Sequence, residues 1–101
     1  MIEFQYFEGC PNAAKTLENL RSALKAVQIE ESAIVLREVP SPEQAEALHF
    51  QGSPTILIDG IDIYTGHKPD SYNYTCRIYT FSGKKTGVIP QGFIEEKLRK
   101  G

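Results

Sequence analysis

The chain has 101 residues, 41% hydrophobic and 24% charged, so its length predicts one domain with a modest core, and its two cysteines are too few for a disulfide-rich secreted scaffold. A net charge of −2 gives no electrostatic basis for binding nucleic acid, no apolar run approaches the roughly 18–20 residues that span a bilayer, and no signal peptide is visible at the N-terminus. The composition therefore predicts a soluble, cytoplasmic, single-domain protein with neither a nucleic-acid nor a membrane partner.

A strand and an amphipathic helix are expected first. Residues 2–7 alternate weakly between apolar and polar and include three aromatic side chains, which predicts a strand. Pro11 suits the first turn of a helix, because its missing N–H has no intrahelical partner there. Apolar residues then recur at spacings of four and three, which predicts one helix over residues 11–27. These residues are Ala13, Leu17, Leu20, Leu24 and Val27.

The next segment predicts a second strand and a second helix. Residues 33–36 form an almost continuous apolar run, as expected of a strand covered on both faces. Ser41 as N-cap, Pro42 at the first helical position and Gln44 in a capping box predict a helix start. Gly52 is well placed to end this helix. Its apolar face is expected to contain Ala45, Leu48 and Phe50.

The rest of the chain predicts a hairpin, a loop and a last helix. Residues 55–58 read as a buried strand, and Asp59-Gly60 before residues 61–64 is a strong hairpin signal. Residues 65–71 read as a loop, and residues 74–81 as a further strand followed by a turn at residues 82–84. Pro90 starts a short helix. The expected order is β-α-β-α-β-β-α in one domain over residues 1–101.

Cys10 stands where a reactive thiol is expected. It follows the first strand and starts the first helix, where free N–H groups and the helix dipole favour a thiolate. The neighbouring carboxylate of Glu8 opposes this effect. A thiolate attacks disulfides and binds soft metals. A lone cysteine is more often a small core residue, but the position of Cys10 favours a functional role.

Cys10 and a second motif together resemble the thioredoxin superfamily. The second motif is Gly52-Ser53-Pro54-Thr55, directly before the third expected strand. The resemblance implies an α/β fold with a mixed four-stranded central sheet flanked by helices, and a cis peptide that ends at Pro54 beside the cysteine. It also implies that Cys10 is the catalytic nucleophile, that Pro11, Ser53 and Pro54 bind substrate, and that an extended substrate pairs with the main-chain edge there.

The chain departs from this family at the redox motif. Where the family has Cys-x-x-Cys, this sequence reads Cys10-Pro11-Asn12-Ala13, so the usual dithiol cycle cannot run within one helical turn. Similarity to monothiol members implies that glutathione, as a co-substrate, or a distant thiol completes the reaction. The prediction is therefore a thiol–disulfide oxidoreductase-like protein that acts on a thiol or disulfide through Cys10.

Cys76 is the distant thiol, and two registers place it differently. If Asp59-Gly60 is a two-residue turn, residues 61–64 are the fourth strand, and Cys76 is expected across from Cys10 as a second catalytic residue. If residues 74–81 are the fourth strand, four or five residues at roughly 3.3 Å each separate Cys76 from the site. That distance is too long for a disulfide. The strong hairpin signal favours the first register.

A weaker resemblance suggests an alternative function. Gly9-Cys10-Pro11-Asn12 and Cys76-Arg77-Ile78-Tyr79 are similar to small thioredoxin-fold proteins related to organomercurial lyases. Those enzymes use two distant cysteines and an aspartate three residues after the first, where this chain has Ala13. The alternative is a non-catalytic module that binds a protein partner, or a soft metal such as Hg(II) through Cys10 and Cys76. His49 and His67 lack further ligands at zinc spacing, so no other metal site is expected.

Overall fold

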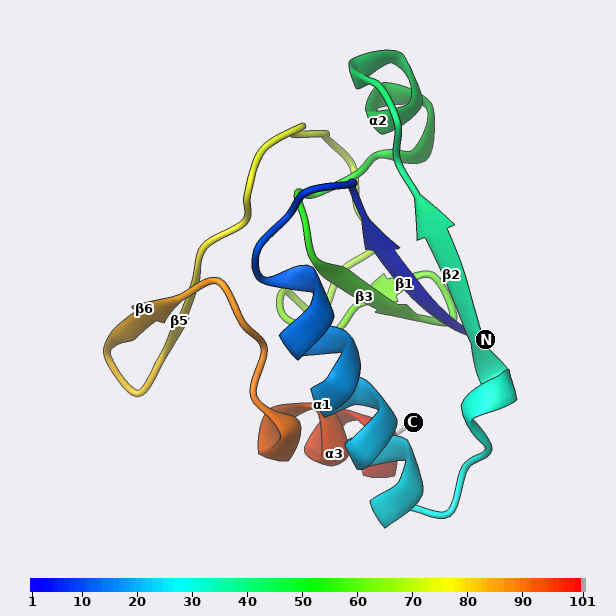
Figure 1. The fold of residues 1–101 in the computed structure, drawn as a ribbon. Coiled ribbons are helices and arrows are strands. Elements are labelled where there is room, and N and C mark those ends of the chain that lie inside the picture. The colour runs from blue at the N-terminus through cyan, green and yellow to red at the C-terminus, as the bar shows by residue number, and fades with distance from the viewer. Residues whose placement is uncertain (101) are drawn as a thin grey trace.

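The computed structural model describes residues 1–100 and has an α/β architecture (Figure 1). A mixed four-stranded sheet has the order β2-β1-β3-β4, in which β1 pairs with β2 in parallel and with β3 antiparallel. Its strands are β1 (Ile2–Tyr6), β2 (Ile34–Glu38), β3 (Thr55–Ile58) and β4 (Ile61–Asp62). The helices are α1 (Ala13–Ala26), α2 (Pro42–Leu48) and α3 (Gln91–Lys100), and a short 3-10 helix, η1 (Glu31–Ala33), precedes β2. The α/β class and a mixed four-stranded sheet, both predicted from the sequence, are confirmed.

The main core lies between the sheet and the pair α1 and α3, which pack against each other (Figure 1). Alternate residues of β1 and β3 enter this core because side chains of a strand point to opposite faces. The apolar stripe of α1 supplies the facing layer. Fully or almost fully buried members are Phe4, Leu20, Leu24, Ile56 and Ile94. Within residues 1–100, every helix is too short or too polar to cross a membrane.

α1 begins two residues later than the sequence predicts. Its first helical residue is Ala13 and its N-cap is Asn12, so Pro11 lies in the preceding turn and not in the helix. The apolar periodicity located the buried stripe correctly. Proline at the start of a turn and proline at the start of a helix look alike in a sequence, because both need the same φ.

α2 stands at the end of the sheet where β2 stops (Figure 1). Its start is as predicted: Pro42 is the first helical residue, and the Ser41 hydroxyl accepts a hydrogen bond from the Gln44 N–H at 3.2 Å. The expectation that Gly52 ends the helix is wrong, because the C-cap is His49, with a left-handed φ of 55°. The chain turns there so that Phe50 enters a second small core, which also contains Val39 and Ala45.

The prediction that the second strand is covered on both faces is also wrong. β2 is an edge strand that pairs with β1 alone within the sheet. Val35 is 38% exposed and Leu36 is 50% exposed. A short apolar run signals a strand, but it does not tell whether the strand lies at the centre or at the edge.

The hairpin at Asp59-Gly60 is confirmed. Both residues have a positive φ, 51° and 82°, and β3 pairs with β4 in antiparallel register. β4 ends at Asp62 and not at residue 64, because the Asp62 carboxylate accepts a hydrogen bond from the Tyr64 N–H at 2.8 Å and starts a turn. The fourth strand of the sheet is therefore the one that follows Asp59-Gly60, as the first of the two registers predicts.

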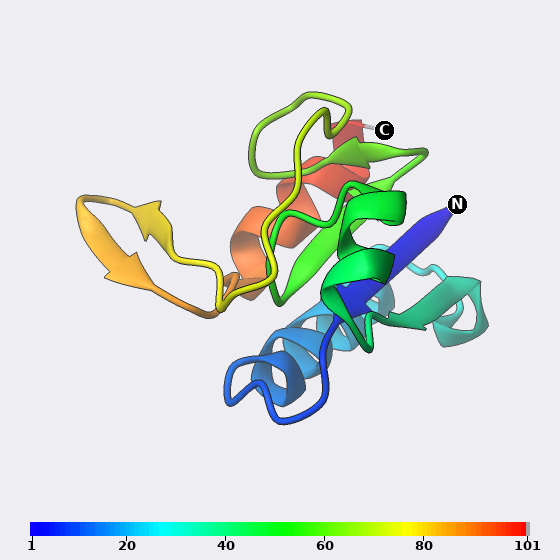
Figure 2. The same ribbon diagram turned by 90° about the horizontal axis from the view of Figure 1, so that it is seen from above.

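Residues 74–81 do not form one strand, contrary to expectation. Only their last part is a strand, β5 (Tyr79–Phe81), which pairs with β6 (Lys84–Thr86) across the predicted turn at Ser82-Gly83. This hairpin forms a separate sheet that projects from the body of the molecule (Figure 2). The residues before β5 run instead beside Ser53, where they join the candidate site.

Candidate functional site

Cys10 lies in the turn between β1 and α1. Its N–H donates to the Phe7 carbonyl at 3.3 Å, and its carbonyl accepts from the Ala13 N–H at 3.3 Å, so the turn leads directly into the helix. The residue is 9% exposed. The thiol therefore lies in the turn directly before the N-terminus of α1.

Ser53 is the residue against which Cys10 packs. The Cys10 Sγ lies 3.7 Å from the Ser53 carbonyl oxygen, and the Ser53 hydroxyl accepts a hydrogen bond from the Phe7 N–H at 3.3 Å. Ser53 is fully buried. The Ser53–Pro54 peptide is cis, as predicted. Two polar contacts thus tie the Cys10 turn to the chain segment that enters β3.

Residues 75–77, called here the 75–77 segment, lie along the main chain of Ser53. The Ser53 N–H donates to the Thr75 carbonyl at 3.0 Å, and the Ser53 carbonyl accepts from the Arg77 N–H at 2.9 Å. Cys76 is therefore the direct parallel-bridge partner of Ser53, and the backbones of such paired segments typically lie about 4.8 Å apart. The Cys76 side chain is exposed. Both cysteines of the chain thus adjoin the same buried residue, from different segments.

Arg77 holds the 75–77 segment in place. Its Nη1 lies 2.6 Å from the Asp62 Oδ2 and donates to the Thr55 hydroxyl at 3.0 Å. The ion pair is almost fully removed from solvent, with 10% of the Arg77 side chain and 2% of the Asp62 side chain exposed. The guanidinium also lies over the rings of Tyr64 and Tyr79, 5.5 and 4.7 Å from their centroids. This anchor is not predictable from the sequence, because no local motif links two residues on separate segments.

Gly52 and Tyr79 complete the contact between the two segments. A Cβ on Gly52 would lie 3.0 Å from the Thr75 carbonyl oxygen and 3.1 Å from the Arg77 Cβ, closer than ordinary van der Waals contact, and the φ of +110° also favours glycine here. The Tyr79 hydroxyl donates a hydrogen bond to the Pro54 carbonyl. Burial raises the pKa of Tyr79, while the nearby Arg77 charge opposes this rise. The hydroxyl therefore stays protonated and keeps its role as a donor at neutral pH.

A pocket of about 260 Å³ opens beside Cys10. It lies between the first turns of α1, the end of β1 and the half-exposed side chain of Leu36 on β2. Its wall is mostly apolar and includes Phe4, Tyr6, Phe7, Ala13, Leu17 and Leu36. Glu8 is the charged residue in the wall. This pocket leaves no signal in the sequence, because it forms only where the edge strand is left uncovered.

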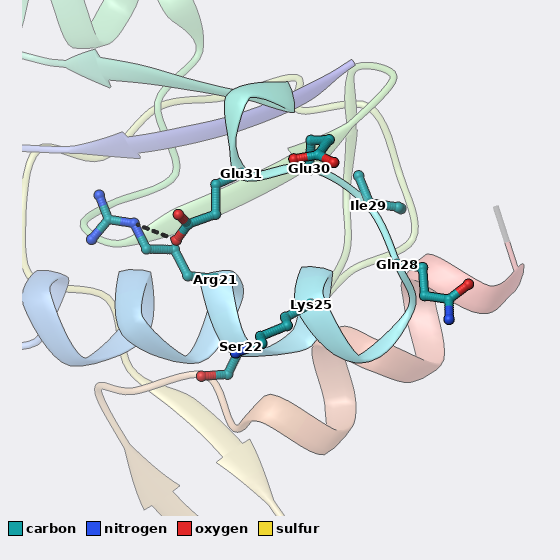
Figure 3. A pocket seen from close by; sticks show the side chains of 7 residues that line it. All are labelled: Arg21, Ser22, Lys25, Gln28, Ile29, Glu30 and Glu31. Carbon is teal, nitrogen blue, oxygen red and sulfur yellow. Dashed lines mark ion pairs between the residues drawn. The ribbon is translucent and has the colours of Figure 1, made fainter.

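A larger hollow of about 540 Å³ lies elsewhere, toward the far end of α1 (Figure 3). It is lined by charged and polar side chains, including Lys25 and Glu30, and Arg21 and Glu31 form an exposed ion pair at 3.5 Å in its wall. It contains no cysteine or histidine. Among residues 1–100, no group of three His, Cys, Asp or Glu side chains is arranged to hold a metal ion. The pocket beside Cys10 thus adjoins a cysteine thiol, whereas this larger hollow does not.

Comparisons of this chain with models of protein families, with curated proteins and with solved structures gave no significant match. The function is therefore argued from the two cysteines, Ser53 and their surroundings.

Proposed function

We propose that this chain is a thioredoxin-like thiol–disulfide exchange protein in which Cys10 is the nucleophile and Cys76 resolves the mixed disulfide. The observation that supports this proposal is that both cysteines adjoin Ser53, Cys10 through its thiol and Cys76 through main-chain pairing. The sheet order β2-β1-β3-β4 supports the thioredoxin-like fold. The place of Cys10 after β1, and of Pro54 before β3, supports it as well.

The proposed reaction has two exchange steps. The Cys10 thiolate attacks one sulfur of a disulfide R–S–S–R, so that a Cys10–S–S–R bond forms and R–S⁻ leaves and takes up a proton. The Cys76 thiolate then attacks the Cys10 sulfur, which forms a Cys10–Cys76 disulfide and releases the second R–S⁻. The substrate is reduced by two electrons and the protein is oxidised by two. An external thiol reductant, such as glutathione, returns the protein to its dithiol form.

The surroundings of the two thiols suit these different roles. Cys10 is buried in the wall of an apolar pocket, where a substrate sulfur is brought to it. Cys76 is exposed on a segment whose position is held by Arg77 and by Ser53. A resolving thiol needs to be close but outside the substrate position, because the mixed disulfide must form first. The arrangement offers this without a second cysteine in the helix.

Counting released thiols tests the proposal. One equivalent of an aryl disulfide is expected to release two aryl thiols per wild-type chain, and Cys76→Ser is expected to release one and keep a mixed disulfide at Cys10. Cys10→Ser serves as the control for any reaction of exposed Cys76 alone. Wild-type protein that releases a single thiol, or a Cys10 that reacts no faster than a small reference thiol, would contradict the proposal.

A second candidate is binding of a soft ion through both thiols. Cys10 and Cys76 adjoin one residue, and no cluster of three potential ligands occurs within residues 1–100. Zinc sites use four ligands, whereas thiolates favour soft ions such as Hg(II) and Cu(I), which accept two. Stoichiometric Hg(II) binding that needs both thiols, without turnover of disulfides, would favour this candidate. Unchanged Hg(II) affinity in Cys76→Ser would exclude the two-thiol site.

A further inference from the structure

The main-chain edge beside Cys10 is already filled. An extended polypeptide that pairs with Ser53 needs its N–H and its carbonyl, but these bond to Thr75 and Arg77 of the same chain. The fit is tight, because a Cβ on Gly52 would lie only 3.0 Å from the Thr75 carbonyl oxygen. No free strand edge remains at Ser53 for a peptide to join.

Displacing the 75–77 segment is costly. It would pull Arg77 away from the Asp62 carboxylate, which is 2% exposed, and from the ring faces of Tyr64 and Tyr79. Removing one partner of a buried ion pair leaves an uncompensated buried charge. A peptide substrate would have to supply equivalent interactions. The segment therefore acts as a fixed wall.

The pocket beside Cys10 is open, and neither Ser53 nor the 75–77 segment lines it. Its volume of about 260 Å³ exceeds the roughly 150 Å³ of a cavity that holds benzene, so it accommodates one aromatic ring or a short alkyl chain. Tyr6 and Phe7 provide aromatic surface, and Leu17 and Leu36 provide aliphatic surface. Such a wall favours apolar groups, because their transfer from water removes apolar area from solvent.

The negative charge near the pocket further limits which substrates are expected. The carboxylate of Glu8 lies in the pocket wall, and the chain as a whole carries a net charge of −2. An anionic group on the substrate sulfur is repelled by both, although the exposure of Glu8 keeps this effect small. A neutral group meets no such opposition.

We infer that the substrate of Cys10 is a small disulfide whose sulfur carries a neutral aryl or short alkyl group, seated in the pocket beside α1, and not an extended polypeptide. This inference rests on the proposed function. The reaction is the two-step exchange described above, with R the apolar group; the external thiol reductant is the same. The pocket holds R of the attacked sulfur, which brings that sulfur to the Cys10 Sγ before the S–S bond breaks.

The test compares three disulfides with the same protein. These are 4,4'-dithiodipyridine (neutral aryl), bis(2-hydroxyethyl) disulfide (small and polar) and a linear peptide with an intermolecular disulfide. Each rate is divided by the rate of the same disulfide with a small reference thiol, which removes its intrinsic reactivity. We expect this ratio to be at least about tenfold higher for the aryl disulfide than for either of the others, a typical scale for an apolar group that fills a pocket.

A variant whose pocket is filled, compared with a matched control variant, tests whether the aryl group binds in this pocket. Ala14→Leu adds a side chain at the pocket wall, on the exposed side of α1, and is expected to remove the advantage of the aryl disulfide. Ala26→Leu makes the same change at the other end of α1, away from the pocket, and is expected to keep it. Alanine and leucine have similar helix propensities, so both variants should fold.

The possible results distinguish a failure of this inference from a failure of the proposed function. An accelerated reaction with equal ratios for all three disulfides, or an Ala14→Leu variant that matches Ala26→Leu, overturns the small apolar substrate and leaves the exchange function standing. A peptide disulfide that reacts best also overturns it. If no disulfide reacts faster with Cys10 than with the reference thiol, the proposed function itself fails.

Discussion

Gly52→Ala tests whether the 75–77 segment is held against the strand entry as described. Both Gly52 and Gly60 have a positive φ, +110° and +82°, but a Cβ on Gly60 meets no atom within 4 Å. Gly60→Ala therefore carries only the backbone cost, about 1–2 kcal/mol. Gly52→Ala adds overpacking against the Thr75 carbonyl oxygen and the Arg77 Cβ, a further cost of about 1–3 kcal/mol.

Equilibrium unfolding in urea measures both costs, with Gly60→Ala as the matched control. We expect Gly52→Ala to lower the free energy of unfolding by about 1–3 kcal/mol more than Gly60→Ala does. Because the 75–77 segment must shift to make room for the added Cβ, we also expect Cys76 to resolve the mixed disulfide less efficiently. In the thiol-release assay, Gly52→Ala should therefore move from two thiols per chain toward one, while Gly60→Ala keeps two.

If the two substitutions destabilise the protein equally and thiol release is unchanged, the 75–77 segment is not tightly packed against Gly52. The segment would then make room for a Cβ without a cost in stability. Cys76 would then not depend on the contact at Gly52.

Three further substitutions address single interactions. Arg77→Met leaves the buried Asp62 carboxylate without its ion-pair partner and should lower the free energy of unfolding in urea by about 3–5 kcal/mol; a loss under about 1 kcal/mol would show that the pair is solvated. Burial raises the pKa of Tyr79 in the folded state, so its contribution to stability is present below the unfolded value of about 10 and is lost as pH rises above it. Tyr79→Phe should therefore make the fall of the free energy of unfolding above pH 10 less steep, by up to about 1.4 kcal/mol per pH unit. A variant that keeps the wild-type slope would show that Tyr79 does not cause this fall. Ser41→Ala removes the N-cap bond to the Gln44 N–H and should cost about 0.5–2 kcal/mol in thermal unfolding, whereas no change in Tm would mean that water replaces the cap.

Periodicity and turn chemistry predicted most of the fold. The spacing of Leu17, Leu20 and Leu24 located α1, and Asp59-Gly60 located the β3–β4 hairpin, because both signals are local. The edge position of β2 was not predicted, since it depends on which strands and helices lie beside it. The sequence predicts one strand over residues 74–81, whereas residues 75–77 pair with the main chain of Ser53 and only the last part of the segment forms β5.

The sequence predicts part of the candidate site. Cys10 and Pro54 stand out because each follows or precedes a recognisable strand. The favoured hairpin register predicts that Cys76 lies across from Cys10, and in the structure Cys76 pairs with Ser53. The Arg77–Asp62 anchor was not found, since a buried ion pair between separate segments leaves no pattern in either one. The pocket beside Cys10 also arises only after α1 packs beside an uncovered edge strand.

We propose that Cys10 and Cys76 act as one redox pair. The most direct measurement is the mass of the protein and of its proteolytic peptides after reaction with one equivalent of a disulfide at high dilution. We expect a loss of two hydrogens from the intact chain and a linked peptide pair that contains Cys10 and Cys76. A stable adduct on Cys10 with a free Cys76, or a disulfide formed between two chains, would contradict it.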